Sequence, residues 1–177
     1  MDEKDFANLI TNIPDYPQPG IIFRDITTLF KDPQGFHDAV DVMCDYYKDM
    51  GITKVVGAEA RGFMMGAPMA YKLGAGFVPA RKPGKLPRET YGQEYALEYG
   101  TDELHIHKDA IDPDDIVLIV DDLVATGGTA VAEYKLVENF NAKIVGMCFM
   151  LELAYLNPRE AIAKYTDTDV YSLIKID

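Results

Sequence analysis

The segment from Val117 to Thr129, VLIVDDLVATGGT, constrains the fold and the chemistry of this chain more than any other. It opens with four apolar residues, which is typical of a strand buried on both faces of a parallel sheet. Asp121 and Asp122 follow where we expect that strand to end. A glycine-containing loop and an amphipathic stretch over residues 130–140 then predict a turn into a helix. The segment therefore predicts a strand, a loop and a helix with two carboxylates at the strand end.

The loop of this segment suits a phosphate monoester. Gly127 and Gly128 allow positive φ and a close approach of the backbone to a ligand. Free N–H groups and the dipole at the helix start, with the hydroxyls of Thr126 and Thr129, favour an anion. Two adjacent carboxylates can accept hydrogen bonds from a vicinal diol. The pattern favours a pocket for a ribose 5-phosphate over a βα turn that only ends a strand and caps a helix.

Other phosphate-binding loops fit this segment less well. A Walker A loop needs a lysine after its last glycine, whereas Gly128 is followed by Thr129. A dinucleotide fingerprint places its acidic residue about 20 residues after the glycines. Here the acidic residues come before the glycines. Both of these nucleotide-binding classes are therefore disfavoured.

Length and composition predict one globular domain over residues 1–177, long enough to bury roughly two-thirds of its unfolded surface. No apolar run approaches the ~20 residues that span a bilayer, and the acidic N-terminus fits neither a signal nor a transit peptide. Cys44 and Cys148 lie far apart in apolar surroundings, so we expect buried, reduced thiols. We therefore expect a cytoplasmic protein with no membrane partner.

The formal net charge of −12 argues against nucleic acid as a partner. Four cationic residues nevertheless occur within eight positions, and Arg61 lies in a separate glycine-flanked turn. The four are Arg81, Lys82, Lys85 and Arg88. Together with Arg61 they could form an electropositive cleft, although a run of charges is often only a solvated face. The histidines show no ligand spacing, so we expect no metal site made by the protein alone.

Strands alternating with helices predict a mostly parallel α/β sheet, with ligands at the carboxyl ends of the strands. The expected strands cover residues 54–57, 76–80, 104–108, 117–120, 143–151 and 170–174, and the expected helices cover residues 6–13, 36–50, 63–73 and 130–140. We expect the strand at 104–108 to be exposed. Residues 83–95 show little apolar periodicity and are expected to form a long surface loop.

The Val117–Thr129 segment resembles the phosphoribosyl pyrophosphate (PRPP) binding motif of type I phosphoribosyltransferases. Four more segments resemble the adenine-specific members of that family, in the family's order and spacing: DYPQPGIIFRDITTLFKD, EARGFMMGAP, VPARKPGKLPRET and LEYG. The similarity covers most of the chain and thins after about Pro158. It implies the type I fold, a mostly parallel twisted sheet flanked by helices. It also implies a small hood from residues 1–33 that contributes to the base site, and a flexible catalytic loop over residues 82–100.

The resemblance implies Mg²⁺-dependent transfer of the 5-phosphoribosyl group from PRPP to adenine, giving AMP and pyrophosphate in purine salvage. Mg²⁺ would bind through PRPP rather than through protein ligands, and the family implies a homodimer. Ala125 favours adenine, because hypoxanthine-guanine enzymes usually carry Asp at that position. The alternatives are a phosphoribosyltransferase for another base, such as xanthine or guanine, and a non-catalytic module that senses PRPP or a nucleotide.

The resemblance also implies roles for individual residues. Catalysis is assigned to Glu98 as acid or base at the purine, with Tyr99 beside it and Arg61 at the pyrophosphate. PRPP and phosphate binding are assigned to Asp121, Asp122, Ala125, Thr126, Gly127, Gly128, Thr129, Arg61, Arg81, Lys82 and Lys85. Adenine binding is assigned to Ile21, Ile22, Phe23, Arg24 and Leu156. The alternatives are a solvated Glu98 and an ordinary apolar core segment at residues 21–23.

Overall fold

A five-stranded sheet forms the centre of the molecule. The structure is a computed structural model that describes residues 1–97 and 100–177. The strands run in the order β4-β3-β7-β8-β9, and every neighbouring pair is parallel. Their bounds are β3 Lys54–Ala58, β4 Gly76–Ala80, β7 Ile116–Val124, β8 Lys143–Leu153 and β9 Val170–Ile176. The predicted parallel α/β sheet is confirmed, with the ends of each expected strand within four residues of those observed.

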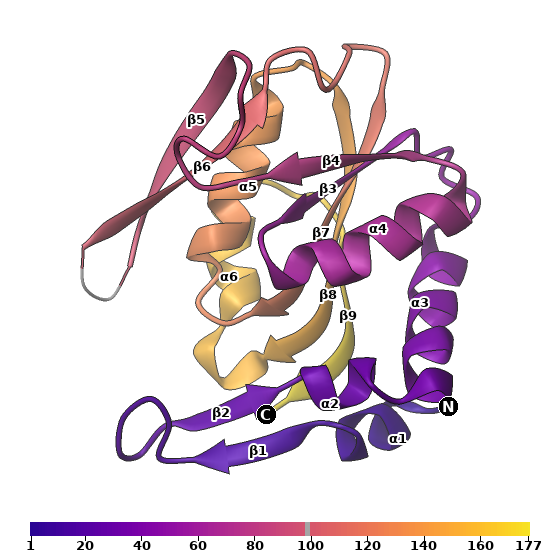
Figure 1. Ribbon diagram of the computed structural model, residues 1–177, viewed down its shortest axis with the longest axis vertical. Helices are drawn as coiled ribbons and strands as arrows, with labels where there is room; N and C mark the ends of the chain where they lie inside the picture. Colours follow the sequence, from indigo (N-terminus) through magenta and orange to yellow (C-terminus); the bar gives the residue numbers. More distant parts are fainter. Residues whose placement is uncertain (98–99) are drawn as a thin grey trace.

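Helices cover both faces of this sheet (Figure 1). The main helices are α3 Pro33–Tyr47, α4 Arg61–Leu73, α5 Gly128–Glu138 and α6 Pro158–Ala163, with shorter turns at α1 Glu3–Asn8, α2 Thr27–Phe30 and the 3-10 helix η1 Ala154–Leu156. Leu118 packs with the core under α3 and α4, whereas its neighbour Ile119 packs with the core under α5. Alternation of side chains along a strand explains this division. Because both faces of β7 are covered, its sequence is continuously apolar.

The N-terminal segment forms a small antiparallel hairpin, β1 Thr11–Pro14 and β2 Ile22–Asp25. It lies below the carboxyl ends of the central strands in Figure 1, where the hood was expected. The helix expected over residues 6–13 is wrong for its last part, because α1 ends at Asn8. Residues 11–13 instead pair with β2, and the Thr11 amide donates to Thr28 Oγ1.

A second hairpin, β5 Thr90–Ala96 and β6 Thr101–His107, extends to the left of the sheet in Figure 1. The surface loop expected over residues 83–95 is therefore wrong from Thr90 onward. Tyr91 and Tyr95 of β5 are partly buried against the core under α5, with only a glycine and two polar residues between them. This pattern is weaker than that of an aliphatic strand. The expected exposure of β6 is also wrong, because Leu104 and Ile106 are buried in that core.

Three further local features concern the end of β7, the two cysteines and the length of the helices. β7 continues to Val124 because Asp121 and Leu123 still pair with β8, so the acid pair lies inside the strand and not beyond it. Cys44 and Cys148 are buried free thiols, as expected. No helix within residues 1–97 and 100–177 is long and apolar enough to cross a bilayer.

Candidate functional site

The predicted site motifs meet at one edge of the sheet. Glu59 follows β3, Arg81 follows β4 and the Asp121–Asp122 pair lies near the end of β7. These three strands are neighbours and parallel, so their carboxyl ends share this edge. The β1–β2 hood and the β5–β6 hairpin flank it (Figure 1). The fold therefore places the motifs where ligands bind in parallel α/β sheets.

Asp121 and Asp122 form a buried acid pair, 9% and 7% exposed. The Asp122 amide donates to Asp121 Oδ1 at 2.9 Å, and Asp122 Oδ2 lies 2.9 Å from Arg61 Nε. Although the two atoms are close, Asp122 Oδ2 has no hydrogen-bond partner within residues 1–97 and 100–177. Burial, followed by repulsion from Asp122, raises the pKa of Asp121. The pair thus keeps acceptor capacity for donors such as the hydroxyls of a diol.

The loop from Ala125 to Thr129 follows the acid pair and opens α5. Gly127 has φ 89°, and a Cβ there would lie 2.9 Å from the Pro158 carbonyl oxygen, so this position requires glycine. Gly127 is also the N-cap and has no side chain to occupy the first amides of α5. Residues 123–130 surround a cavity of about 100 Å³. This cradle has the open backbone and the helix start that a phosphate group needs.

Three of the four cations expected to bind phosphate are each paired with a carboxylate, Arg61 with Asp122 as above. Arg81 Nε lies 3.1 Å from Glu59 Oε1, and the Lys82 amide donates to the same oxygen at 2.8 Å. Burial tends to raise the pKa of Glu59, but these hydrogen bonds and the charge of Arg81 lower it overall. The Lys82 ammonium contacts Asp102 on β6.

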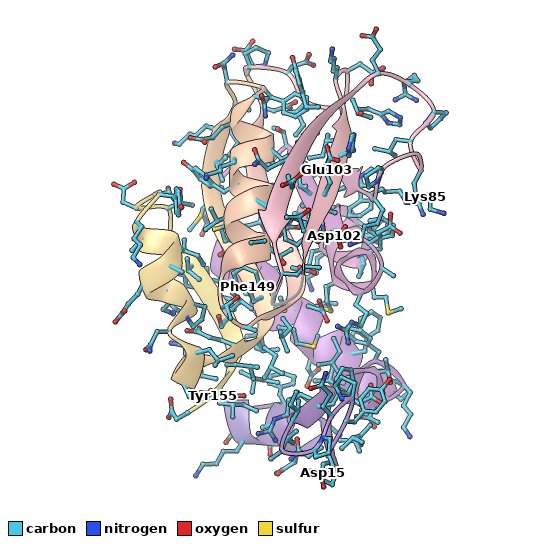
Figure 2. The ribbon with its side chains drawn as sticks, turned by 90° about the vertical axis from the view of Figure 1, so that its left-hand side faces the viewer. Asp15, Lys85, Asp102, Glu103, Phe149 and Tyr155 are labelled. Atoms are coloured by element: carbon cyan, nitrogen blue, oxygen red, sulfur yellow. The ribbon has the colours of Figure 1, made fainter. Side chains whose placement is uncertain are left out.

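The remaining two cations of the predicted cleft, Lys85 and Arg88, are both exposed to solvent. Lys85 is exposed, on the loop before the hairpin (Figure 2). Arg88 forms an exposed pair with Asp109, with Nε 3.0 Å from Oδ2. Arg88 therefore belongs to a solvated face, and the predicted cleft is smaller than the sequence suggested.

The hood brings the expected base-binding segment to the same edge. Ile21 and Ile22 are 44% and 50% exposed, so the alternative of an ordinary core segment is wrong. The Arg61 guanidinium lies 5.8 Å from the centroid of the Phe23 ring, which joins the hood to the turn after β3. Arg24 donates to Asn12 on the paired strand.

Leu156, the last residue assigned to adenine, is 41% exposed and ends the turn η1. Tyr155 of the same turn lies beside the hood (Figure 2). Glu98 and Tyr99, the residues assigned to catalysis at the purine, lie outside the described residues.

Sequence reasoning missed Glu133 on α5. This side chain is fully buried, and neither carboxylate oxygen has a hydrogen-bond partner among the described residues. Burial, then the charges of Asp121 and Asp122, raise its pKa well above the usual value. Glu133 follows Thr129 by one helical turn, and an acidic residue on the apolar face of a predicted helix was the signal available in the sequence.

A larger cavity of about 420 Å³ also touches the phosphate cradle. It lies between the β5 strand, α5 and α6, and it shares residues 126–128 with the cradle. Its other walls include Tyr95, Lys135, Lys164 and Tyr165. None of the acid pair, Arg61 or the hood lines this cavity, so we place the site at the smaller cradle beside the acid pair.

Comparison with known proteins assigns the chain to a family. Residues 26–176 match the phosphoribosyl transferase domain family, so the chain belongs to the phosphoribosyltransferases, a family of enzymes. The adenine phosphoribosyltransferase of Thermotoga neapolitana is 55% identical over 174 residues, which cover 98% of this chain and 99% of that protein.

Solved structures agree with this assignment. The crystal structure of adenine phosphoribosyltransferase from Thermoanaerobacter pseudethanolicus has a TM-score of 0.92 at 46% identity, covering 98% of this chain and 99% of that one. The Giardia lamblia enzyme complexed with 9-deazaadenine has a TM-score of 0.93 at 35% identity, covering 100% and 99%. The expected type I phosphoribosyltransferase fold and the resemblance to the adenine-specific members are confirmed.

Proposed function

We propose that this enzyme transfers the 5-phosphoribosyl group of PRPP to adenine, giving AMP and pyrophosphate for purine salvage. The observation that carries the proposal is the buried acid pair placed directly before a glycine-opened helix start. This arrangement suits a ribose diol and a 5-phosphate on one ligand. The adenine specificity of the relatives named above supports the choice of base.

The proposed division of work follows from the charges at the sheet edge. Asp121 and Asp122 accept hydrogen bonds from the ribose hydroxyls, and residues 125–129 hold the 5-phosphate. Arg61, with Arg81 and Lys82, stabilises the pyrophosphate. As the C1′–O bond breaks, its electron pair leaves with pyrophosphate. The adenine nitrogen N9 bonds to C1′ with inversion and gives up its proton, which we propose Glu98 accepts. Electrostatic stabilisation of the leaving group supplies much of the catalysis.

We propose that Mg²⁺ accompanies PRPP and, when bound, neutralises part of its charge. In residues 1–97 and 100–177, no group of three or more His, Cys, Asp or Glu side chains is arranged to hold a metal ion. An ion held here would complete its shell with ligand oxygens and water, which suits Mg²⁺. The carboxylates of Asp121 and Asp122 are hard oxygen donors of the kind it prefers.

Base selection is proposed to depend on residues 21–24 and Ala125. Backbone near Ile22 would read the exocyclic amine, with Arg24 and Leu156 beside the ring. A site that hydrogen-bonds an amine rejects an oxo-purine because the wrong group leaves buried polar atoms unpaired. The 9-deazaadenine bound by the Giardia lamblia enzyme supports an adenine-shaped pocket in the family. Glu98 remains the proposed acid or base at the purine.

We also propose a homodimer acting in the cytoplasm. Family resemblance supports the dimer, and sedimentation of the purified protein would measure it. The two buried free thiols support a reducing compartment.

The test is to mix the protein with PRPP, Mg²⁺ and one of adenine, hypoxanthine, guanine or xanthine, and to follow nucleotide formation. AMP from adenine alone is the expected result. Turnover of an oxo-purine would contradict the adenine assignment while leaving the reaction class intact. PRPP binding without product from any base would favour the sensor alternative.

A further inference from the structure

One carboxylate near the site, Asp102, lies outside the sequence motifs that predict the site. Arg61 is paired with Asp122 of the acid pair, and Arg81 with Glu59 of the turn after β3. The partner of Lys82 is Asp102, which lies on β6, 20 residues further along the chain. The proposed function gives Asp102 no role.

The β5–β6 hairpin presents two groups to the Lys82 ammonium. Asp102 and Tyr95 are directly opposite each other across the two strands. Lys82 Nζ lies 3.4 Å from the Tyr95 hydroxyl and 5.8 Å from the centroid of its ring, in addition to the Asp102 contact. The Glu103 amide donates to Asp102 Oδ1 at 2.8 Å, which orients that carboxylate. Figure 2 shows Asp102 and Glu103 in succession on this strand.

This pairing opposes the proposed use of Lys82 on a ligand. The side chains of Lys82 and Asp102 are 38% and 28% exposed, so solvent only partly screens their attraction. A phosphoryl oxygen that approaches the ammonium must compete with the Asp102 carboxylate and is repelled by it. The same carboxylate is available to take Lys82 back when an anionic product leaves.

We propose that Asp102 is a positioning residue that, with Tyr95, holds Lys82 in an ion pair which PRPP or pyrophosphate must displace. This inference rests on the proposed function, because it takes Lys82 as a phosphate contact. Asp102 therefore weakens the binding of both polyanions and favours their release.

The experiment measures binding of Mg²⁺-pyrophosphate and Mg²⁺-PRPP to the wild type and to Asp102→Asn by calorimetry. Asparagine preserves the shape of the side chain and removes its charge. We expect each ligand to bind about fivefold tighter, the size of a partly exposed ion pair. A gain in affinity cannot result from a damaged fold, so it separates this role from a purely structural one.

Glu103→Gln is the matched control, since its carboxylate pairs instead with His105, with Oε1 2.9 Å from Nε2. The Asp102→Asn change is then repeated in a Lys82→Met background, where we expect its effect to disappear. Unchanged or weaker binding by Asp102→Asn would overturn the proposal, and so would an equal gain in the Lys82→Met background. Failure of the wild type to bind either ligand would instead contradict the proposed function.

Discussion

At the scale of single residues, the acid pair combines a chemical role with a cost in stability. Asp121 and Asp122 are buried side by side, and burial with their mutual repulsion raises the pKa of Asp121. Among the described residues, Asp122 is the one member of the pair that forms an ion pair, with the guanidinium of Arg61. Such an arrangement is unfavourable for folding alone, and binding a diol offers a physical reason for it.

Replacement of both acids by asparagine tests that reason. We expect Asp121→Asn with Asp122→Asn to weaken PRPP binding about 100-fold or more, because hydrogen bonds to charged acceptors are lost. The melting temperature at pH 8 should not fall, since the substitution removes buried charge. Calorimetric titration with PRPP measures the first effect, and exposed Asp109→Asn is the control. Unchanged PRPP affinity would contradict the diol assignment.

Glu133 gives a pH-dependent prediction. Its pKa in the folded state is raised above 4.5 by burial and then by Asp121 and Asp122. Its contribution to stability is therefore full below the unfolded pKa of about 4.5 and is lost as pH rises through the raised folded pKa. Glu133→Gln cannot ionise, so we expect it to be more stable than the wild type by about 1–3 kcal/mol at pH 8.

Urea unfolding of Glu133→Gln at pH 8 and at pH 4.5 measures this difference, which should shrink toward the lower pH. Glu138→Gln, at an exposed position of the same helix, controls for the general loss of a negative charge. Equal destabilisation of Glu133→Gln at both pH values would show instead that the carboxylate makes a contact the fold requires.

At the scale of elements, an ion pair with a buried carboxylate connects the end of β8 to α6. Glu152 is 2% exposed, and Arg159 donates to both of its oxygens, with Nε 2.8 Å from Oε1 and an Nη atom 2.8 Å from Oε2. A second Nη of Arg159 donates to the Val170 carbonyl on β9. The turn η1, which carries Leu156, lies between these two residues. The pair therefore fixes a turn that the proposed base site uses.

Arg159→Leu should lower the free energy of unfolding by about 2–3 kcal/mol at pH 7, less than for a fully buried pair because Arg159 is 42% exposed. Burial tends to raise the pKa of Glu152, but the hydrogen bonds and the charge of Arg159 lower it below 4.5 overall. The stabilisation is thus present above pH 4.5 and lost as pH falls through the lowered pKa. Urea unfolding at pH 7 and pH 3 checks the sign.

The same variant should raise KM for adenine more than KM for PRPP, because η1 borders the proposed base site and not the phosphate cradle. Arg159→Lys keeps the charge without the planar fork of the guanidinium. Its KM for adenine should therefore lie between that of the wild type and that of Arg159→Leu. An equal rise in both KM values would indicate a general loss of structure.

The elements also show what the sequence could and could not predict. The β7–α5 unit was predictable because its apolar run, acid pair and glycines are contiguous. β5 was not, because Tyr91 and Tyr95 gain their burial from packing near α5 and from pairing with β6. The Lys82–Asp102 contact joins the loop before β5 to the strand β6. The two residues are 20 positions apart in the sequence, and no local pattern indicates such a pair. Contacts between elements therefore determined the parts that sequence reasoning missed.

At the scale of the whole molecule, a net charge of −12 surrounds a site proposed for a polyanion. The described structure resolves part of this conflict locally, because Arg61, Arg81 and Lys82 gather at one sheet edge. The carboxylates paired with these cations reduce the positive field there. The excess negative charge elsewhere still repels itself, and this repulsion acts on the folded state as a whole.

Salt should consequently stabilise this protein. Raising ionic strength from about 0.01 M to 0.15 M shortens the Debye length from about 30 Å to 8 Å, which screens repulsion between distant like charges more than attraction within close pairs. We expect the melting temperature to rise by several degrees over this range, about 1 kcal/mol for a chain of this size. Differential scanning calorimetry measures it, with NaCl, KCl and choline chloride compared at matched ionic strength. Equal shifts in the three salts identify screening, whereas a shift with one cation alone would indicate specific ion binding. A melting temperature that falls with salt would show that the close ion pairs contribute more to stability than the overall repulsion removes.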